Sequence, residues 1–191
     1  MIEQQTYHKS DSDIEYEKEL IIKAQKSPKE FAPLYDSYYL LIFRYVIKRV
    51  KDENDAAAIT SDIFAKALFN LGKFKFKGLP FSSWLYRIAS NEITDYYRRR
   101  QSSKYVRVTE DQLNYLVDNA EDGISIDSDK EEKFSQIITS LEILSDEDLE
   151  LIEMRFFEER SFKEMAEILD ITEGNARIKT HRAITKLKNN I

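Results

Sequence analysis

Hydrophobic residues recur at intervals of three and four along most of this 191-residue chain. That spacing puts apolar side chains on one face of a helix, so it predicts a series of amphipathic α-helices. Lysines and apolar residues alternate between Lys73 and Phe81, but because no partner strand is evident we expect a loop there. The pattern therefore predicts an all-α protein. The predicted helices cover approximately residues 16–26, 28–50, 55–71, 84–100, 134–144, 146–157, 162–169 and 173–188.

Start signals mark several of these helices. Ser27 and Glu30 have the spacing of a capping box and enclose a proline, which favours the first turn of a helix. Ser161 and Glu164 form a second box of this kind, and Thr172 is a suitable N-cap for the final helix. These signals define where the chain enters each helix.

Composition supports a helical fold and argues against several functions. The chain has four Gly and three Pro, few helix breakers for its length, and 42% hydrophobic residues, enough to build cores. It has no Cys, two His and no metal-binding motif, so we expect no disulfide, no metal and no cofactor. No nucleotide-binding or nucleophile-elbow motif is present, so we do not expect an enzyme. No apolar run suits a signal peptide or membrane span, which predicts a cytoplasmic protein without membrane insertion.

Charge is distributed unevenly, although the formal net charge is only −6. Residues 91–107 hold five cations and two acids, and residues 173–191 hold five cations and one acid. Between them, residues 110–133 hold nine acids and two cations and show no sustained hydrophobic period. We therefore predict four segments: a polar tail (1–14), a helical domain (15–101), an acidic linker (102–133) and a second small helical domain (134–191).

The last two predicted helices are joined by a short turn at Asp170–Thr172, and the second helix is basic. This layout is typical of a helix-turn-helix that reads DNA. An ordinary helical hairpin with a solvated basic face shows the same pattern. The pattern by itself leaves both interpretations open.

Three segments resemble the extracytoplasmic-function class of bacterial sigma factors, in the sigma-70 family. Residues 31–38, FAPLYDSY, look like the opening of the family's first conserved region. Residues 81–99 are similar to the more specific pattern F-x-x-W-L-y-r-I-A-x-N-x-x-x-D-x-x-R-R. Residues 151–158 and the final helix pair look like the family's C-terminal DNA-binding domain.

The resemblance implies a promoter-specificity factor rather than an enzyme. Its partners would be promoter DNA, the β′ and β subunits of core RNA polymerase, and an anti-sigma factor, and the free protein would be a monomer. The N-terminal domain would hold polymerase and open the minus-ten element, and the C-terminal domain would read the minus-thirty-five element. The linker would pass through the polymerase.

Promoter opening requires capture of unstacked bases, for which aromatic faces and cations are suited. The lysine-rich loop and the helix after it supply both. Core packing explains the position of Trp84 equally well. We expect minus-ten contacts from Lys73, Lys75, Lys77, Trp84, Arg87, Asn91, Thr94, Arg98 and Arg99.

Residues near the start of a recognition helix reach base edges in the major groove. We expect base contacts from Glu173, Asn175, Arg177 and Lys179, and phosphate contacts from Thr180 and Arg182. An acid at the first helical position also favours the helix dipole, which explains Glu173 equally well.

The resemblance places contacts with core polymerase at Asp55, Asp62, Phe64, Phe156 and Phe157. The chain departs here from the family pattern D-A-E-D-L-x-Q-[DE]-x-F, because Ala57, Ala58 and Ser61 replace polar residues. That change would weaken or alter core binding. It keeps two alternatives open: a free-standing helix-turn-helix regulator, dimeric on palindromic sites, and an interaction module that has lost promoter opening.

Overall fold

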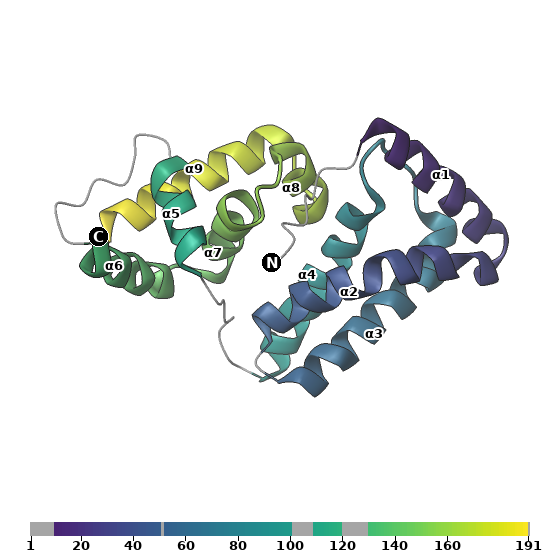
Figure 1. Cartoon of the computed structure of the whole chain (residues 1–191), viewed down its shortest axis with the longest axis horizontal. Coiled ribbons are helices and arrows are strands. Elements are labelled where there is room, and N and C mark those ends of the chain that lie inside the picture. Colours follow the sequence, from purple (N-terminus) through teal and green to yellow (C-terminus); the bar gives the residue numbers. More distant parts are fainter. Residues whose placement is uncertain (1–9, 51, 101–108, 120–129, 191) are drawn as a thin grey trace. The chain divides into compact units, whose positions relative to one another are not determined.

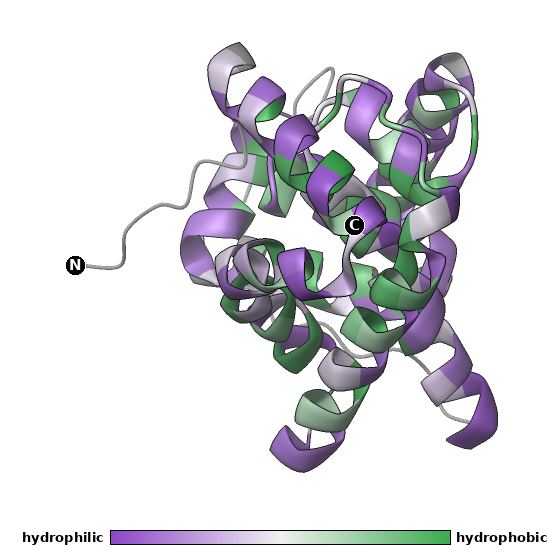
Figure 2. Cartoon of the chain, turned by 90° about the vertical axis from the view of Figure 1, so that its right-hand side faces the viewer, coloured by the Kyte–Doolittle hydropathy of each residue, from purple (hydrophilic) through white to green (hydrophobic). Residues whose placement is uncertain are grey.

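The computed structural model describes residues 10–50, 52–100, 109–119 and 130–190, and no strand occurs within these ranges. This confirms the all-α prediction. The chain divides into two compact units, Met1–Val106 and Arg107–Ile191, each built from packed helices (Figure 1). Hydrophobic and hydrophilic residues alternate around the helices in Figure 2, as expected for helices that bury one face. Within the described ranges, no helix is both long enough and apolar enough to cross a bilayer.

The helices of the first unit are close to those predicted. The described elements are α1 (Asp11–Lys26), η1 (Pro28–Phe31), α2 (Ala32–Arg49), α3 (Glu53–Asn70), η2 (Leu71–Lys73) and α4 (Phe81–Arg100). Helix α2 packs on α3 and α4, and α1 contacts α2 and the two 3₁₀ turns, η1 and η2. The predicted loop follows η2 and ends where α4 begins.

Two helix starts differ from the prediction. Helix α1 begins inside the range predicted to be a tail, because the Ser10 hydroxyl accepts a hydrogen bond from the backbone N–H of Asp13 at 3.2 Å and caps the helix. Ser27 makes no side-chain cap, so the capping box predicted there is wrong. Its carbonyl instead accepts from the N–H of Glu30 at 2.9 Å, which closes a 3₁₀ turn. Residues 1–9 of the predicted tail lie outside the described residues.

The second unit contains a helix that the sequence pattern did not predict. Helix α5 (Glu110–Asn119) lies inside the predicted acidic linker, with Leu113 and Leu116 buried. It contacts α6 (Lys130–Ile143) and η3 (Glu153–Phe157). Two buried residues in one short helix do not make a sustained hydrophobic period, which is why the pattern missed it. The described elements are α5 (Glu110–Asn119), α6 (Lys130–Ile143), α7 (Asp146–Ile152), η3 (Glu153–Phe157), α8 (Phe162–Leu169) and α9 (Glu173–Asn189).

A buried ion pair follows η3, which is a single π-helical turn. The side chain of Arg160 is 1% exposed, and its Nε lies 2.5 Å from Oε2 of Glu158, which is 8% exposed. Glu159 between them has a left-handed backbone, with φ of 53°. The ion pair therefore lies within the short segment that connects η3 to α8 (Phe162–Leu169).

Candidate nucleic-acid interface

Helices α8 and α9 form the predicted helix-turn-helix and begin at the predicted residues. The Ser161 hydroxyl accepts from the N–H of Glu164 at 3.2 Å, and the Glu164 carboxylate accepts from the N–H of Ser161 at 3.0 Å. Asp170 ends α8 in a left-handed conformation, with φ of 56° and ψ of 44°. Thr172 then caps α9 by accepting from the N–H of Asn175 at 3.2 Å. These caps set the start and direction of α9.

One side of α9 packs against α7 and α8 while the other is exposed. Glu173, Asn175, Arg177 and Arg182 are exposed, as recognition residues must be. Thr180 is 3% exposed, and its hydroxyl donates to the carbonyl of Ala176 at 2.9 Å. The hydroxyl is therefore engaged within its own helix, and the phosphate contact of Thr180 stays a prediction that would require this bond to open.

Phe162, at the start of α8, has two guanidinium groups near its ring. The guanidinium carbons of Arg155 and Arg177 are 4.8 and 4.7 Å from its ring centre. The carboxylate of Glu173 lies 3.8 Å from Arg177. Cation–π contact and the nearby acid both restrict Arg177. The spacing of residues along the chain did not reveal this arrangement.

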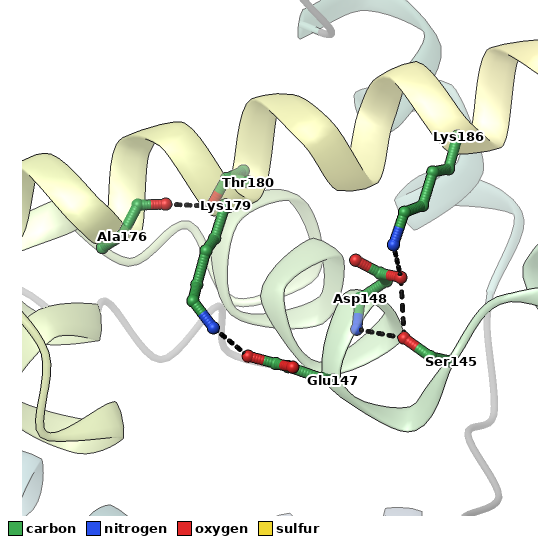
Figure 3. A network of polar contacts seen from close by, with 7 residues as sticks. All are labelled: Ser145, Glu147, Asp148, Ala176, Lys179, Thr180 and Lys186. Atoms are coloured by element: carbon green, nitrogen blue, oxygen red, sulfur yellow. Dashed lines mark hydrogen bonds and ion pairs between the residues drawn. The ribbon is translucent and has the colours of Figure 1, made fainter.

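Acidic residues at the start of α7 pair with cations of α9 (Figure 3). Glu147 forms an ion pair with Lys179, which is therefore half-buried rather than fully presented. The Nζ of Lys186 lies 2.6 Å from the Asp148 carboxylate. That carboxylate also accepts from the Ser145 hydroxyl at 2.6 Å. The network joins the recognition helix to α7 and reduces the positive charge it presents.

The network changes the acidity of Asp148. Burial acts to raise the pKa of this carboxyl, but hydrogen bonds from Lys186 and Ser145 outweigh it, with help from the charge of Lys179. The pKa of Asp148 therefore lies below its ordinary value of 3.8. Since the folded pKa is depressed, the stabilisation is present above the unfolded pKa and is lost as pH falls through the folded pKa.

We predict a pH-dependent stability difference between wild type and Asp148→Asn. Measured by urea unfolding, the difference should be constant above about pH 5 and shrink as the pH drops below the ordinary carboxyl range. Asp146→Asn, which removes an exposed carboxyl from the same turn, is the matched control. A wild-type advantage over Asp148→Asn that persists unchanged down to about pH 2 would contradict the prediction.

An aromatic cluster joins the predicted loop to the core of the first unit. Phe81 is fully buried, and its ring centre lies 6.5 Å from Phe31, 5.9 Å from Tyr38 and 5.6 Å from Phe74. The Trp84 ring lies 4.7 Å from Phe74. Trp84 is half-buried, so it packs partly on the core and keeps part of its ring at the surface. The two interpretations of this residue are therefore compatible.

The polar side of α4 has the predicted arrangement. Arg87 is half-buried, while Asn91, Thr94, Arg98 and Arg99 are exposed. Arg98 lies 2.9 Å from Asp95 on the same helix. In the preceding segment Lys73, Lys75 and Lys77 are also exposed. Helix and loop together present cations beside partly exposed aromatic rings.

Glu17 is a residue of this site that sequence reasoning missed. It lies on α1 and is 3% exposed. Its carboxylate accepts a hydrogen bond from the N–H of Phe81 at 3.0 Å, at the start of α4, and another from the Tyr38 hydroxyl of α2. A glutamate within a charged helical segment is usually solvated, so no signal in the sequence distinguished it.

The residues expected to contact core polymerase lie at different depths. Asp62 is exposed, but Phe64 is 3% exposed and its ring centre lies 6.5 Å from that of the buried Phe31. Phe156 is 7% exposed and Phe157 is half-buried. Phe64 and Phe156 therefore offer little surface to a partner, and their predicted contacts with core polymerase stay predictions. Both side chains lie in a core. The sequence could not show this, because an apolar position on a helix looks the same whether it faces the core or a partner.

Asp55 is engaged within its own unit. Its carboxylate accepts from the Tyr96 hydroxyl at 2.9 Å and from Arg100 at 2.8 Å. Burial, together with the hydrogen bond to Asp55, raises the pKa of Tyr96 to about 12. A partner that binds the Asp55 carboxylate must therefore compete for it with Tyr96 and Arg100.

Comparison with known proteins identifies both units. The family model of sigma-70 region 2 matches residues 34–103, and that of sigma-70 region 4 matches residues 140–189. The chain is 29% identical over 185 residues to the ECF RNA polymerase sigma factor BldN of Streptomyces coelicolor, covering 93% of this chain and 67% of that protein. It is 29% identical over 160 residues to the RNA polymerase sigma factor YlaC of Bacillus subtilis, covering 83% and 90%.

A solved structure shares the fold. The structure of CnrH in complex with the cytosolic domain of CnrY has a TM-score of 0.55 and 21% identity, and the match covers 89% of this chain and 93% of that chain. The arrangement of helices is therefore one already seen in a solved protein.

Proposed function

This chain belongs to the extracytoplasmic-function class of the sigma-70 family and serves as an RNA polymerase sigma factor, and we propose that each unit recognises one promoter element. The observation that carries the proposal is that region 2 falls within the first unit and region 4 within the second. Each region contains a helix, α4 or α9, with exposed cations. Core RNA polymerase and promoter DNA are its partners, and the protein acts as a reversible subunit rather than a catalyst.

In the second unit, the first half of α9 reads the minus-thirty-five element. Asn175 and Arg177 are exposed there, and such side chains discriminate adenine and guanine by about 1–3 kcal/mol each. Phe162 restricts Arg177 before DNA arrives, which reduces the entropy lost on binding. Arg182, farther along the exposed side, contacts phosphate.

In the first unit, the segment after η2 and the polar side of α4 hold the opened minus-ten element. Trp84 supports stacking of an unpaired base, while Arg87 and Asn91 offer polar contacts on a rigid helix. The exposed lysines of the loop attract the single-stranded backbone. This assignment rests on the exposure of these groups and on the family of the chain.

The core-binding surface of α3 is less polar than the family pattern. Asp62 is an exposed acid on this helix, and Asp55 is shared with Tyr96 and Arg100. The Ser61 hydroxyl donates to the carbonyl of Ala57 at 3.0 Å, so it is already engaged within the helix. We propose that α3 binds the β′ subunit through fewer polar contacts than the family pattern would provide. We also propose that Phe157 of the second unit contacts the β subunit.

Regulation follows from the same proposal. We place the action of the protein in the cytoplasm, as a free monomer that an anti-sigma protein holds inactive. Light scattering should give the mass of one chain. A dimer would favour the alternative of a free-standing regulator on palindromic DNA.

Transcription in vitro tests the proposed function. Core polymerase from the source organism is incubated with fragmented genomic DNA, with and without this protein. The expected result is a set of new transcripts that start downstream of a shared two-block motif. Absence of new transcripts with a folded protein would overturn the proposal.

We predict that Glu147→Gln strengthens binding to duplex DNA that carries the promoter found in this way. The exposed Glu147–Lys179 pair is worth about 0.2–1 kcal/mol, so its loss should raise affinity by up to about fivefold at low salt. Lys179 then becomes available to the DNA, and the dependence of affinity on salt should steepen. Fluorescence anisotropy with the full-length chain measures both effects.

Asp146→Asn is the matched control for this prediction. It removes the same charge from the same turn of α7 but breaks no ion pair with α9. An equal gain from both variants would show that long-range charge, and not the contact with Lys179, limits binding.

A further inference from the structure

We infer that helix α1 is a positioning element for promoter opening, which holds the Lys73–Phe81 segment and the first turn of α4 ready to receive unpaired bases. The inference rests on the proposed function of that segment. Helix α1, Asp11–Lys26, lies wholly before the matched region 2, which begins at residue 34. Its part in the site comes from contacts that join it to distant parts of the first unit.

The buried carboxylate of Glu17 is the central contact. It accepts from the backbone N–H of Phe81, the first residue of α4, and from the hydroxyl of Tyr38 on α2. The N-terminus of a helix carries unpaired N–H groups and a partial positive charge, which favour an anion there. Glu17 therefore does for α4, from another helix, what a capping residue normally does from within the chain.

The other end of the segment is held by the same helix. The side-chain amide of Gln25 donates to the carbonyl of Leu71 at 3.0 Å and to that of Phe74 at 2.9 Å. The ammonium of Lys18 lies 5.8 Å from the ring centre of Phe76. Thus α1 contacts the start, the middle and the end of the segment.

Holding the segment has a consequence for promoter opening. A segment ordered before DNA arrives loses less conformational entropy when it captures a base. Duplex DNA exposes its bases only briefly and at a cost, so capture from a duplex depends strongly on such order. A template that is already open does not need this step. Loss of the α1 contacts should therefore impair opening far more than later steps.

The test compares duplex and pre-opened templates. Glu17→Gln keeps the shape of the side chain but removes the charge at the start of α4. With core polymerase and the promoter found above, we expect initiation on duplex DNA to fall about tenfold, as for loss of one charge-assisted hydrogen bond. On a heteroduplex mismatched across the minus-ten element, initiation should stay within about twofold of wild type, as should core affinity.

Glu19→Gln is the matched control, since it makes the same chemical change at an exposed position of α1. It should match wild type on both templates. Gln25→Ala is a second variant, chosen because Gln25 is exposed and its replacement leaves no cavity in the core. It should show the same selective loss on duplex DNA, even if Glu17→Gln fails to fold.

Three outcomes would overturn the inference. Equal losses on both templates would show a general defect in initiation. Wild-type activity on duplex DNA, found for both Gln25→Ala and a folded Glu17→Gln, would show that α1 has no positioning role. In both cases wild-type transcription would leave the proposed function standing. A wild-type chain that initiates on neither template would overturn the proposed function itself, and the inference with it.

Discussion

Replacing Arg87 and Asn91 together with alanine is expected to abolish most promoter opening while core polymerase stays bound. Both side chains lie on the polar side of α4, Arg87 half-buried and Asn91 exposed. Contacts of this kind to bases contribute about 1–3 kcal/mol each, so loss of both should reduce open complexes about thirtyfold or more. Permanganate footprinting of the minus-ten element measures opening, and anisotropy measures core binding.

Arg44→Ala with Asn119→Ala is the matched control, because it removes the same two side-chain types from exposed positions outside α4. Its opening should equal that of wild type. The double variant of α4 should remain defective on the heteroduplex template, unlike Glu17→Gln, because it lacks groups that touch the strand. Full rescue on that template would contradict direct contact.

Replacing Arg160 with methionine is expected to destabilise the second unit strongly. The change removes the guanidinium that pairs with the buried Glu158 carboxylate, and breaking a buried pair costs about 3–5 kcal/mol. Whole domains are stable by only about 5–15 kcal/mol, so this cost removes a large part of the stability of the second unit and should weaken minus-thirty-five recognition. The double change Glu158→Leu with Arg160→Met should restore most of the stability, because it removes both buried charges.

The chain carries a convenient probe for this prediction. Its single tryptophan, Trp84, lies in the first unit, while circular dichroism reports helices in both. Arg160→Met should lower one circular-dichroism transition in urea and leave the fluorescence transition of Trp84 unchanged. A variant with both transitions unchanged would show that the buried pair adds little to stability.

Much of the helix-turn-helix was predictable because its signals are local. Ser161, Glu164 and Thr172 cap the helices that follow them, and Asp170 takes the left-handed turn. Capping depends on residues three apart, so a sequence displays it directly. Ser27 had the same local signal and failed, because the chain closes a 3₁₀ turn there instead. The same spacing of residues can therefore accompany either a side-chain cap or a 3₁₀ turn.

The sequence by itself determined the all-α class, the family and the cations of α4 and α9, because helical periodicity, motif spacing and charge are properties of residues near one another in the chain. Only the tertiary structure decided which side chains are available. Packing buried Thr180, Phe64 and Phe156, and paired Lys179 with Glu147. It also brought Glu17 to the start of α4, a contact across 64 positions of the chain. Such contacts depend on how helices pack, and no local pattern records that.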